Sequence, residues 1–199
     1  MTLYDLKPRF QALLRPLTAQ LARFGVTANQ VTLAAATVSV VVGAVLCLFP
    51  GERALFLLLP VWLFVRMALN AIDGMLAREF GQKSRLGGYL NELCDVVSDA
   101  ALLLPFAFLP PFSAGTVLAA IFLAMLSEYA GVTGPLVGAS RRYDGPLGKS
   151  DRALVIGALG LWIGCGLPLA TWALWIMPAI ALLLAATVVN RVRHGLLES

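Results

Sequence analysis

The sequence is poor in charged residues. Of its 199 residues, 13% are Asp, Glu, Lys or Arg and 59% are hydrophobic, whereas a soluble domain carries about 25% charge. This composition indicates a chain whose solvent is lipid. The single histidine, His194, and three scattered cysteines in apolar stretches (Cys47, Cys94 and Cys165) argue against a disulfide framework or a zinc site.

Acidic residues are scarcer than basic ones, 11 against 15, and the basic residues are unevenly placed. Six apolar stretches, residues 28–49, 54–75, 86–109, 113–136, 153–169 and 172–189, each approach the ~20 residues that a membrane helix needs. The two ends of the chain and the links after the second and fourth stretches hold almost all the Lys and Arg, while the opposite links hold only Arg53, beside Glu52. The asymmetry predicts that both termini are cytoplasmic.

The segment before the first stretch is amphipathic. Apolar residues recur at helical spacing from Leu3 to Phe24, with basic residues between them, which is typical of a helix in the membrane interface. No small-residue cleavage site follows, so we expect no removable signal peptide. The predicted fold is an all-α polytopic membrane protein with six transmembrane helices. It forms a single domain over 1–199, with the interfacial helix in 1–26 and the six-helix bundle in 27–194.

Polar side chains interrupt the second and third stretches. Asn70, Asp73 and Ala77 share one helical face, and Asn91, Asp95 and Asp99 share one face of the next helix. A short link makes these helices antiparallel neighbours. A rise of ~1.5 Å per residue then places Asp73 near Asn91, Asn70 near Asp95 and Arg66 near Asp99.

Carboxylates within a membrane are costly unless they are paired or bound to metal. No cation is evident at the level of Asp73 and Asp95, so a divalent cation with oxygen ligands is the expected partner. A structural polar seam between helices is the alternative. The intramembrane Arg66 also needs a partner, for which Asp99 is favoured and Glu128 is the rival.

The spacing of these residues resembles the signature of the CDP-alcohol phosphotransferases, D-x-x-D-G-x-x-A-R, eight residues, then G-x-x-x-D-x-x-x-D. The signature residues present are Asp73, Gly74, Ala77, Arg78, Gly87 and Asp95, whereas Asn70 and Asn91 stand at the two other aspartate positions. The stretch 27–32 is similar to the family's T-P-N-x-x-T. The resemblance implies transfer of a phosphatidyl group from a CDP-linked lipid, such as CDP-diacylglycerol, to a polar alcohol, with release of CMP. It further implies Mg²⁺ or Mn²⁺ as cofactor, with one or two ions.

Roles for the site residues follow from the same resemblance. Asp73, Asp95, Asn70 and Asn91 occupy the metal-ligand positions, and Asp95 would also be the catalytic general base. The nucleotide-binding positions are those of Asp73, Gly74, Ala77, Arg78 and Gly87.

Two signature aspartates are replaced by Asn70 and Asn91, so the four positions carry a formal charge of −2 instead of −4. Asparagine is a weaker ligand for magnesium. The site would therefore hold one tight metal, recruit a second with substrate, or catalyse weakly, and Asp99 is a possible compensating ligand. Three hypotheses remain: an active transferase, a homologue that binds nucleotide or lipid without efficient turnover, and a transporter.

Lys149 and Arg152 lie just before the fifth stretch, where the family often places basic residues that hold the phosphate of the acceptor. They are the predicted acceptor-binding residues, and glycerol 3-phosphate is the example that they favour; Arg141 and Arg142 fit ordinary positive-inside bias. The expected partners are the CDP-linked lipid, a small polar alcohol, the lipid bilayer and a second copy in a homodimer, without nucleic acid. The expected location is the bacterial inner membrane.

Overall fold

The structure is a computed structural model, which describes residues 3–198, with side chains from Arg9 to Glu198. These residues form helices and connecting turns without strands, so the all-α prediction is confirmed. The α-helices are α1 (Leu3–Arg23), α2 (Ala28–Leu48), α3 (Leu58–Glu79), α4 (Arg85–Leu103), α5 (Ala114–Val132), α6 (Lys149–Gly164) and α7 (Ile176–Glu198). Short 3-10 turns are η1 (Arg53–Leu57), η2 (Leu104–Phe108), η3 (Gly134–Val137) and η4 (Thr171–Trp175).

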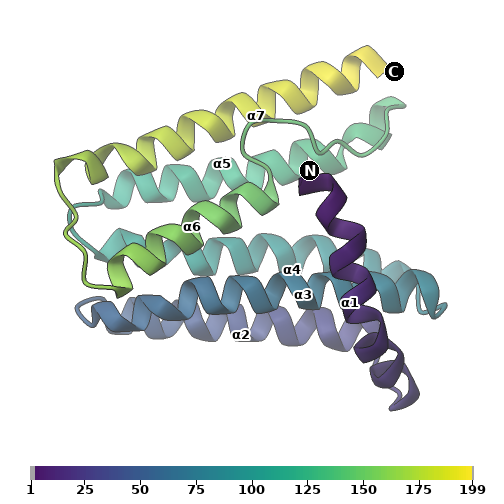
Figure 1. Cartoon of the computed structure of the whole chain (residues 1–199). Coiled ribbons are helices and arrows are strands. Elements are labelled where there is room, and N and C mark those ends of the chain that lie inside the picture. The colour runs from purple at the N-terminus through teal and green to yellow at the C-terminus, as the bar shows by residue number, and fades with distance from the viewer. Residues whose placement is uncertain (1–2, 199) are drawn as a thin grey trace.

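Helices α2 to α7 run roughly parallel to a common axis (Figure 1). Helix α2 packs against both α3 and α4, α5 packs against α7, and α6 lies on α3. Helices α3 and α4 were predicted to be neighbours because their link is short. Both rest on α2, however, and long polar side chains carry much of the contact between them.

Glycines allow the closest helix approaches. A Cβ on Gly43 of α2 would lie 2.2 Å from the carbonyl oxygen of Ala101 in α4. A Cβ on Gly160 of α6 would lie 2.7 Å from the Cβ of Leu59 in α3. Small residues at such positions let helices associate by van der Waals contact, which is the main attraction available between helices in lipid.

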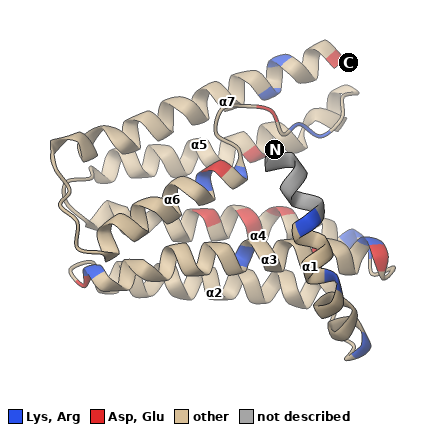
Figure 2. Ribbon diagram, in the orientation of Figure 1, with Lys and Arg blue, Asp and Glu red and all other residues tan. Residues whose placement is uncertain are grey.

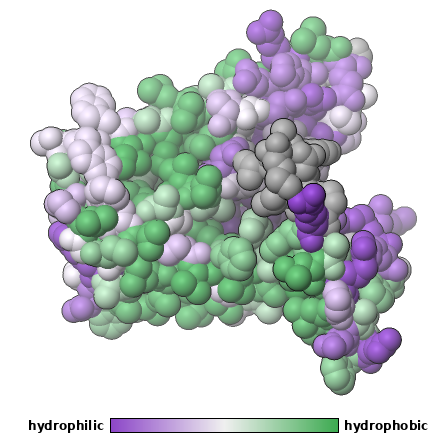
Figure 3. All heavy atoms as spheres, in the orientation of Figure 1, coloured by the Kyte–Doolittle hydropathy of each residue, from purple (hydrophilic) through white to green (hydrophobic). Residues whose placement is uncertain are grey.

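Four segments are long and apolar enough to cross a membrane, within the residues that the structure describes. They are Ala28–Leu48, Arg53–Glu79, Ala114–Val132 and Thr171–Glu198. The two other long helices of the bundle fall short for different reasons: α4 carries Glu92, Asp95 and Asp99, and α6 has only 16 residues. An apolar band covers the middle of the visible surface (Figure 3), and charged residues gather near the end crossed by α1 (Figure 2).

Helix α1 crosses the ends of α2 and α3 at a steep angle (Figure 1). Leu14 and Leu21 pack on a core that includes Ile72 and Met75 of α3. The opposite side exposes Leu13, Leu17 and Phe24, while the side chains of Leu3 and Leu6 lie outside the described residues. Arg15 donates two hydrogen bonds of 3.0 Å to Glu79, at the end of α3. The helix is therefore tied to the element that carries Asp73.

Candidate active site

The start of α2 is fixed beside the link between α3 and α4. Thr27 caps α2, in a reciprocal capping box with Gln30. The Gln82 amide accepts a hydrogen bond from the Ala28 backbone N–H at 2.7 Å and donates one to the Val26 carbonyl at 3.3 Å. A Cβ on Gly87 would lie 2.8 Å from Oδ1 of Asn29. The 27–32 stretch thus lies against the signature residue Gly87.

Asp73 is buried, with 5% of its surface exposed. The Thr32 hydroxyl donates a hydrogen bond of 2.7 Å to its Oδ2, and the Gly74 backbone also donates to this carboxylate. Asp95 and Lys149 are both near enough to act on Asp73 electrostatically. The contact with Thr32 was not foreseen, although Thr32 belongs to the stretch that resembled the family.

At the end of α3, the side chain of Arg78 folds back over Gly74. A Cβ on Gly74 would lie 2.9 Å from Nη2 and 3.1 Å from Nη1 of Arg78. Ala77 packs beside the core shared by α1, α2 and α3. Gly74 therefore provides the space in which the Arg78 guanidinium lies.

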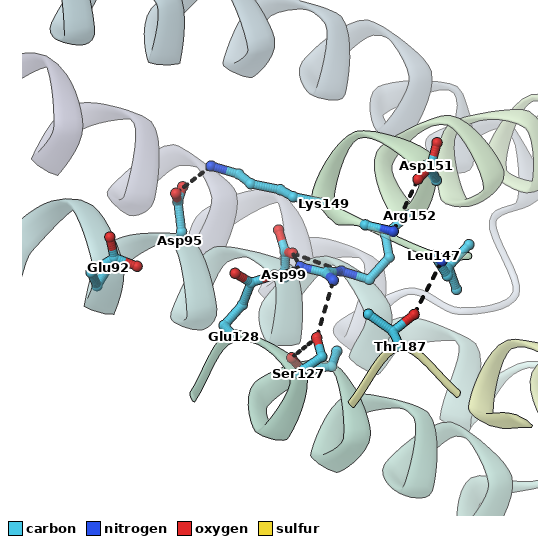
Figure 4. Close-up of polar contacts among 12 residues, drawn as sticks. Glu92, Asp95, Asp99, Ser127, Glu128, Leu147, Lys149, Asp151, Arg152 and Thr187 are labelled. Atoms are coloured by element: carbon cyan, nitrogen blue, oxygen red, sulfur yellow. Dashed lines mark hydrogen bonds and ion pairs between the residues drawn. The ribbon is translucent and has the colours of Figure 1, made fainter. Parts of the chain in front are cut away.

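Asp95 receives a cation on each carboxylate oxygen. Arg66 donates to Oδ1 at 3.1 Å, and Nζ of Lys149, at the start of α6, contacts Oδ2. Figure 4 shows the lysine reaching across from its helix to Asp95. The expectation that no cation lies at this level was wrong, because Lys149 arrives from a helix that is distant in sequence.

Arg66 makes the expected ion pair with Asp99, at 2.6 Å. The rival partner Glu128 instead contacts Arg152 at 2.8 Å and Arg191 at 3.4 Å. Arg152 also contacts Asp99 at 2.8 Å (Figure 4). These ion pairs form a continuous charge network. The network joins α3, α4, α5, α6 and α7 through arginines that are almost fully buried.

Arg141 and Arg142 make specific contacts instead of lying free at the surface. Arg141 pairs with Glu92, with Nη2 2.7 Å from Oε2, and stacks 4.7 Å above the Tyr143 ring. Arg142 donates to Asp144 at 2.7 Å. The Arg142 guanidinium holds the pKa of Asp144 down to about 2.

The donor set fits a divalent cation only partly. Carboxylate and carboxamide oxygens are suitable ligands for Mg²⁺ or Mn²⁺. Within residues 3–198, however, no group of three or more His, Cys, Asp or Glu side chains is placed to hold a metal. Asn70 and Asn91, both half-buried, are the reason, since they supply carboxamides where the family signature has carboxylates.

The family model for CDP-alcohol phosphatidyltransferases matches residues 25–189, and the chain belongs to this family. The matched region contains both halves of the signature and the basic start of α6. The family is one of membrane transferases of phospholipid biosynthesis.

Two relatives in sequence are similar over most of the chain. The inner membrane protein YnbA of Escherichia coli is 48% identical over 199 residues, covering 100% of this chain and 98% of its own length. The phosphatidylinositol phosphate synthase of Mycobacteroides abscessus is 30% identical, covering 92% of this chain and 85% of its own. With the apolar helices, these matches establish a membrane location.

Two solved structures of the phosphatidylinositol phosphate synthase of Mycobacterium tuberculosis share the fold. The complex with manganese and citrate superposes with a TM-score of 0.73 at 25% identity, covering 91% of this chain and 88% of the other. The form with CDP-DAG bound has a TM-score of 0.67 at 25% identity, covering 92% and 91%.

Proposed function

We propose that the protein is a metal-dependent phosphatidyltransferase. It would move the phosphatidyl group of a CDP-linked lipid such as CDP-diacylglycerol to a small polar alcohol and release CMP. The observation that carries this proposal is the pair of signature carboxylates on α3 and α4. Asp73 accepts a hydrogen bond from Thr32, and Asp95 is held by Arg66 and Lys149. The CDP-DAG complex of the mycobacterial relative supports the choice of donor.

The metal would be Mg²⁺ or Mn²⁺, as one or two ions, held by Asp73 and Asp95 with the carbonyl oxygens of Asn70 and Asn91. When bound, a divalent cation supplies charge neutralisation for the donor diphosphate. The manganese complex of the same relative supports this cofactor. Arg78 would contribute further positive charge at the nucleotide phosphates, and Gly74, Ala77 and Gly87 would lie against the nucleotide.

The chain's own residues would orient the reactants and move one proton. Asp95 would accept the hydroxyl proton of the acceptor as the acceptor oxygen attacks the phosphorus of the phosphatidyl group, and the bond to CMP breaks. Arg66 holds one oxygen of Asp95 at 3.1 Å and would fix the carboxylate's direction. Thr32 would do the same for Asp73 through its 2.7 Å hydrogen bond.

The acceptor would bind at the start of α6. The side chain of Lys149 is 34% exposed and would contact a phosphorylated polyol such as glycerol 3-phosphate by exchanging its ion pair with Asp95 for the phosphate. Arg152 is 4% exposed and has two carboxylate partners, so it would contribute mainly by holding the helix end and the local charge. The product named for the mycobacterial relatives makes inositol phosphate a second acceptor to test.

The whole chain would form one membrane domain, with residues 1–26 at the interface and 27–194 as six spans. Helices α4 and α6 would complete the six because they run alongside the four apolar spans (Figure 1). Both termini would face the cytoplasm of a bacterial inner membrane, and the protein would be a homodimer. In intact cells, a membrane-impermeant maleimide should then label the exposed Cys165 from outside, and the purified protein should have the mass of two chains.

The direct test is CMP release by purified, folded protein given CDP-diacylglycerol, Mg²⁺ or Mn²⁺ and a panel of acceptors. We expect release with at least one acceptor and a loss of about 100-fold or more in Asp95→Asn, the range for losing a general base. Glu52→Gln, an exposed change at the opposite end of the bundle, is the matched control. Absence of CMP release with every acceptor would refute the proposal.

The second candidate is a homologue that binds nucleotide or lipid without efficient turnover. It is favoured by Asn70, Asn91 and the lack of a three-carboxylate cluster among the described residues. If it is correct, wild-type protein shows a thermal shift with CDP but no turnover, and the double variant Asn70→Asp, Asn91→Asp gains activity. Turnover by the wild type that Asp95→Asn abolishes would exclude it.

A further inference from the structure

The lysine at the start of α6 occupies the oxygen that the proposed reaction needs. Nζ of Lys149 contacts Oδ2 of Asp95, and Arg66 already holds Oδ1. Both carboxylate oxygens therefore have a cationic partner. An acceptor hydroxyl can donate its hydrogen to Asp95 Oδ2 only after the ammonium group has moved away.

The two cations differ in mobility. The side chain of Arg66 is 4% exposed and is held by Asp99 as well as Asp95. Lys149 is 34% exposed, and its four-carbon stem allows the ammonium group to swing without moving the backbone. The backbone below it is fixed, because Arg152 anchors α6 on Asp99 and Glu128. Of the two cations on Asp95, the lysine is the one that can leave.

We propose, on the basis of the function proposed above, that Lys149 guards Asp95 against water and releases it to an anionic acceptor. A phosphate group on the acceptor attracts the ammonium group, which exchanges its contact with Asp95 for the phosphate and so frees Oδ2 for the acceptor hydroxyl. Water carries no charge that could draw Lys149 away. The same residue would then favour transfer over hydrolysis of the donor.

The two competing reactions differ only in the attacking oxygen. In transfer, the acceptor oxygen bonds to the phosphatidyl phosphorus, the bond from that phosphorus to CMP breaks, and the hydroxyl proton passes to Asp95. In hydrolysis, water takes the place of the acceptor, and the products are phosphatidic acid and CMP. The ratio of phosphatidic acid to transfer product therefore measures how well Lys149 keeps water from reacting in place of the acceptor.

The experiment compares Lys149→Met and Lys149→Arg with wild type in full-length protein, using labelled CDP-diacylglycerol with and without the acceptor panel. Lys149→Met should raise the ratio of phosphatidic acid to transfer product by roughly two- to fivefold, as expected for losing one partly exposed ion pair. The KM for a phosphorylated acceptor should rise as well. Lys149→Arg should keep the ratio near that of wild type, and Lys83→Met, at an exposed position outside the site, should leave it unchanged.

A second measurement does not depend on turnover. Removing the ammonium group leaves Asp95 Oδ2 free, so Lys149→Met should bind Mn²⁺ several-fold more tightly than wild type in an electron paramagnetic resonance titration. Parallel losses of transfer and hydrolysis, with unchanged Mn²⁺ affinity, would overturn the guard role while leaving the transferase function intact. If wild type releases no CMP with any acceptor, the proposed function and the guard role both fail.

Discussion

Three arginines, Arg66, Arg152 and Arg191, have 2–4% of their surface exposed in a bundle whose core is mostly apolar. Each contacts at least one carboxylate from another helix. A buried pair gains little net free energy over an apolar pair of the same shape, but removing one partner leaves an uncompensated charge. These residues therefore fix which helices meet and at what level.

Arg66→Leu tests this at the level of one residue. It leaves Asp99 with Arg152 alone and removes one of the two cations on Asp95. We expect a loss of about 3 kcal/mol in the free energy of unfolding, the range for breaking a buried pair, measured by denaturant unfolding in detergent. Arg53→Leu, an exposed arginine near the other end of the bundle, should lose much less.

The double variant Arg66→Leu, Asp99→Leu separates the ion pair from side-chain packing. It should recover part of the stability, because no carboxylate of the pair remains without its arginine. If the single Arg66→Leu variant unfolds like wild type, the charge network has no role in stability.

The sequence predicted some of these contacts and missed others for a physical reason. The ion pair between Arg66 and Asp99 could be predicted, because the rise per residue on either side of one short link places both at the same depth. The contact between Lys149 and Asp95 depends on how α6 lies on α3, which no local spacing encodes. Asn70 and Asn91 could be recognised as departures because both stand at aspartate positions of the signature.

Helix α6 shows how an element's limits escape a hydropathy pattern. The apolar stretch was predicted to begin at residue 153, whereas the helix begins at Lys149. The Gly148 backbone N–H donates to the Asp151 carboxylate at 2.9 Å, which fixes the charged first turn in helical form. A hydropathy pattern leaves this first turn out of the predicted helix because its residues are polar. The turn nevertheless carries both predicted acceptor-binding residues, Lys149 and Arg152.

Two glycines of α6, Gly157 and Gly160, allow a test of how closely this helix approaches α3. A Cβ on Gly160 would lie 2.7 Å from Leu59 Cβ and 3.0 Å from the Phe56 carbonyl oxygen, whereas a Cβ on Gly157 would meet only ordinary contacts at 3.6 Å. Gly160→Ala should lower the free energy of unfolding by about 1–3 kcal/mol through overpacking. Gly157→Ala, the matched control, should be neutral or stabilising by up to about 1 kcal/mol. Equal effects of the two changes would contradict the close approach of α6.

Across the whole molecule, the end of α7 closes the bundle against the link between α5 and α6. The sixth apolar stretch was predicted to end at residue 189, but α7 continues to Glu198. Its last turns have partners: Arg191 donates to the Asp144 carbonyl at 3.2 Å, and Nδ1 of His194 lies 3.2 Å from Asp144 Oδ1. From the sequence alone, a basic tail is expected to be solvated. Its partner Asp144 could not be predicted because it lies in the distant link between α5 and α6.

Asp144 gives this closure a defined dependence on pH. Its pKa falls from an ordinary 3.8 to about 2, chiefly through the Arg142 guanidinium. Because the folded-state pKa is the lower one, the stabilisation is fully present above about pH 4 and is lost as pH falls toward 2. The difference in unfolding temperature between wild type and Asp144→Asn should therefore be constant at neutral pH and shrink over that window.

Arg142→Gln removes the same contact from the other side and serves as the matched variant. At neutral pH it should lose stability in the same direction as Asp144→Asn, and its difference from wild type should shrink over the same acidic window. Tryptophan fluorescence during heating, at a series of pH values in detergent, measures both. A gap between wild type and Asp144→Asn that persists unchanged to pH 2 would show that the carboxylate of Asp144 does not hold the α5–α6 link against α7.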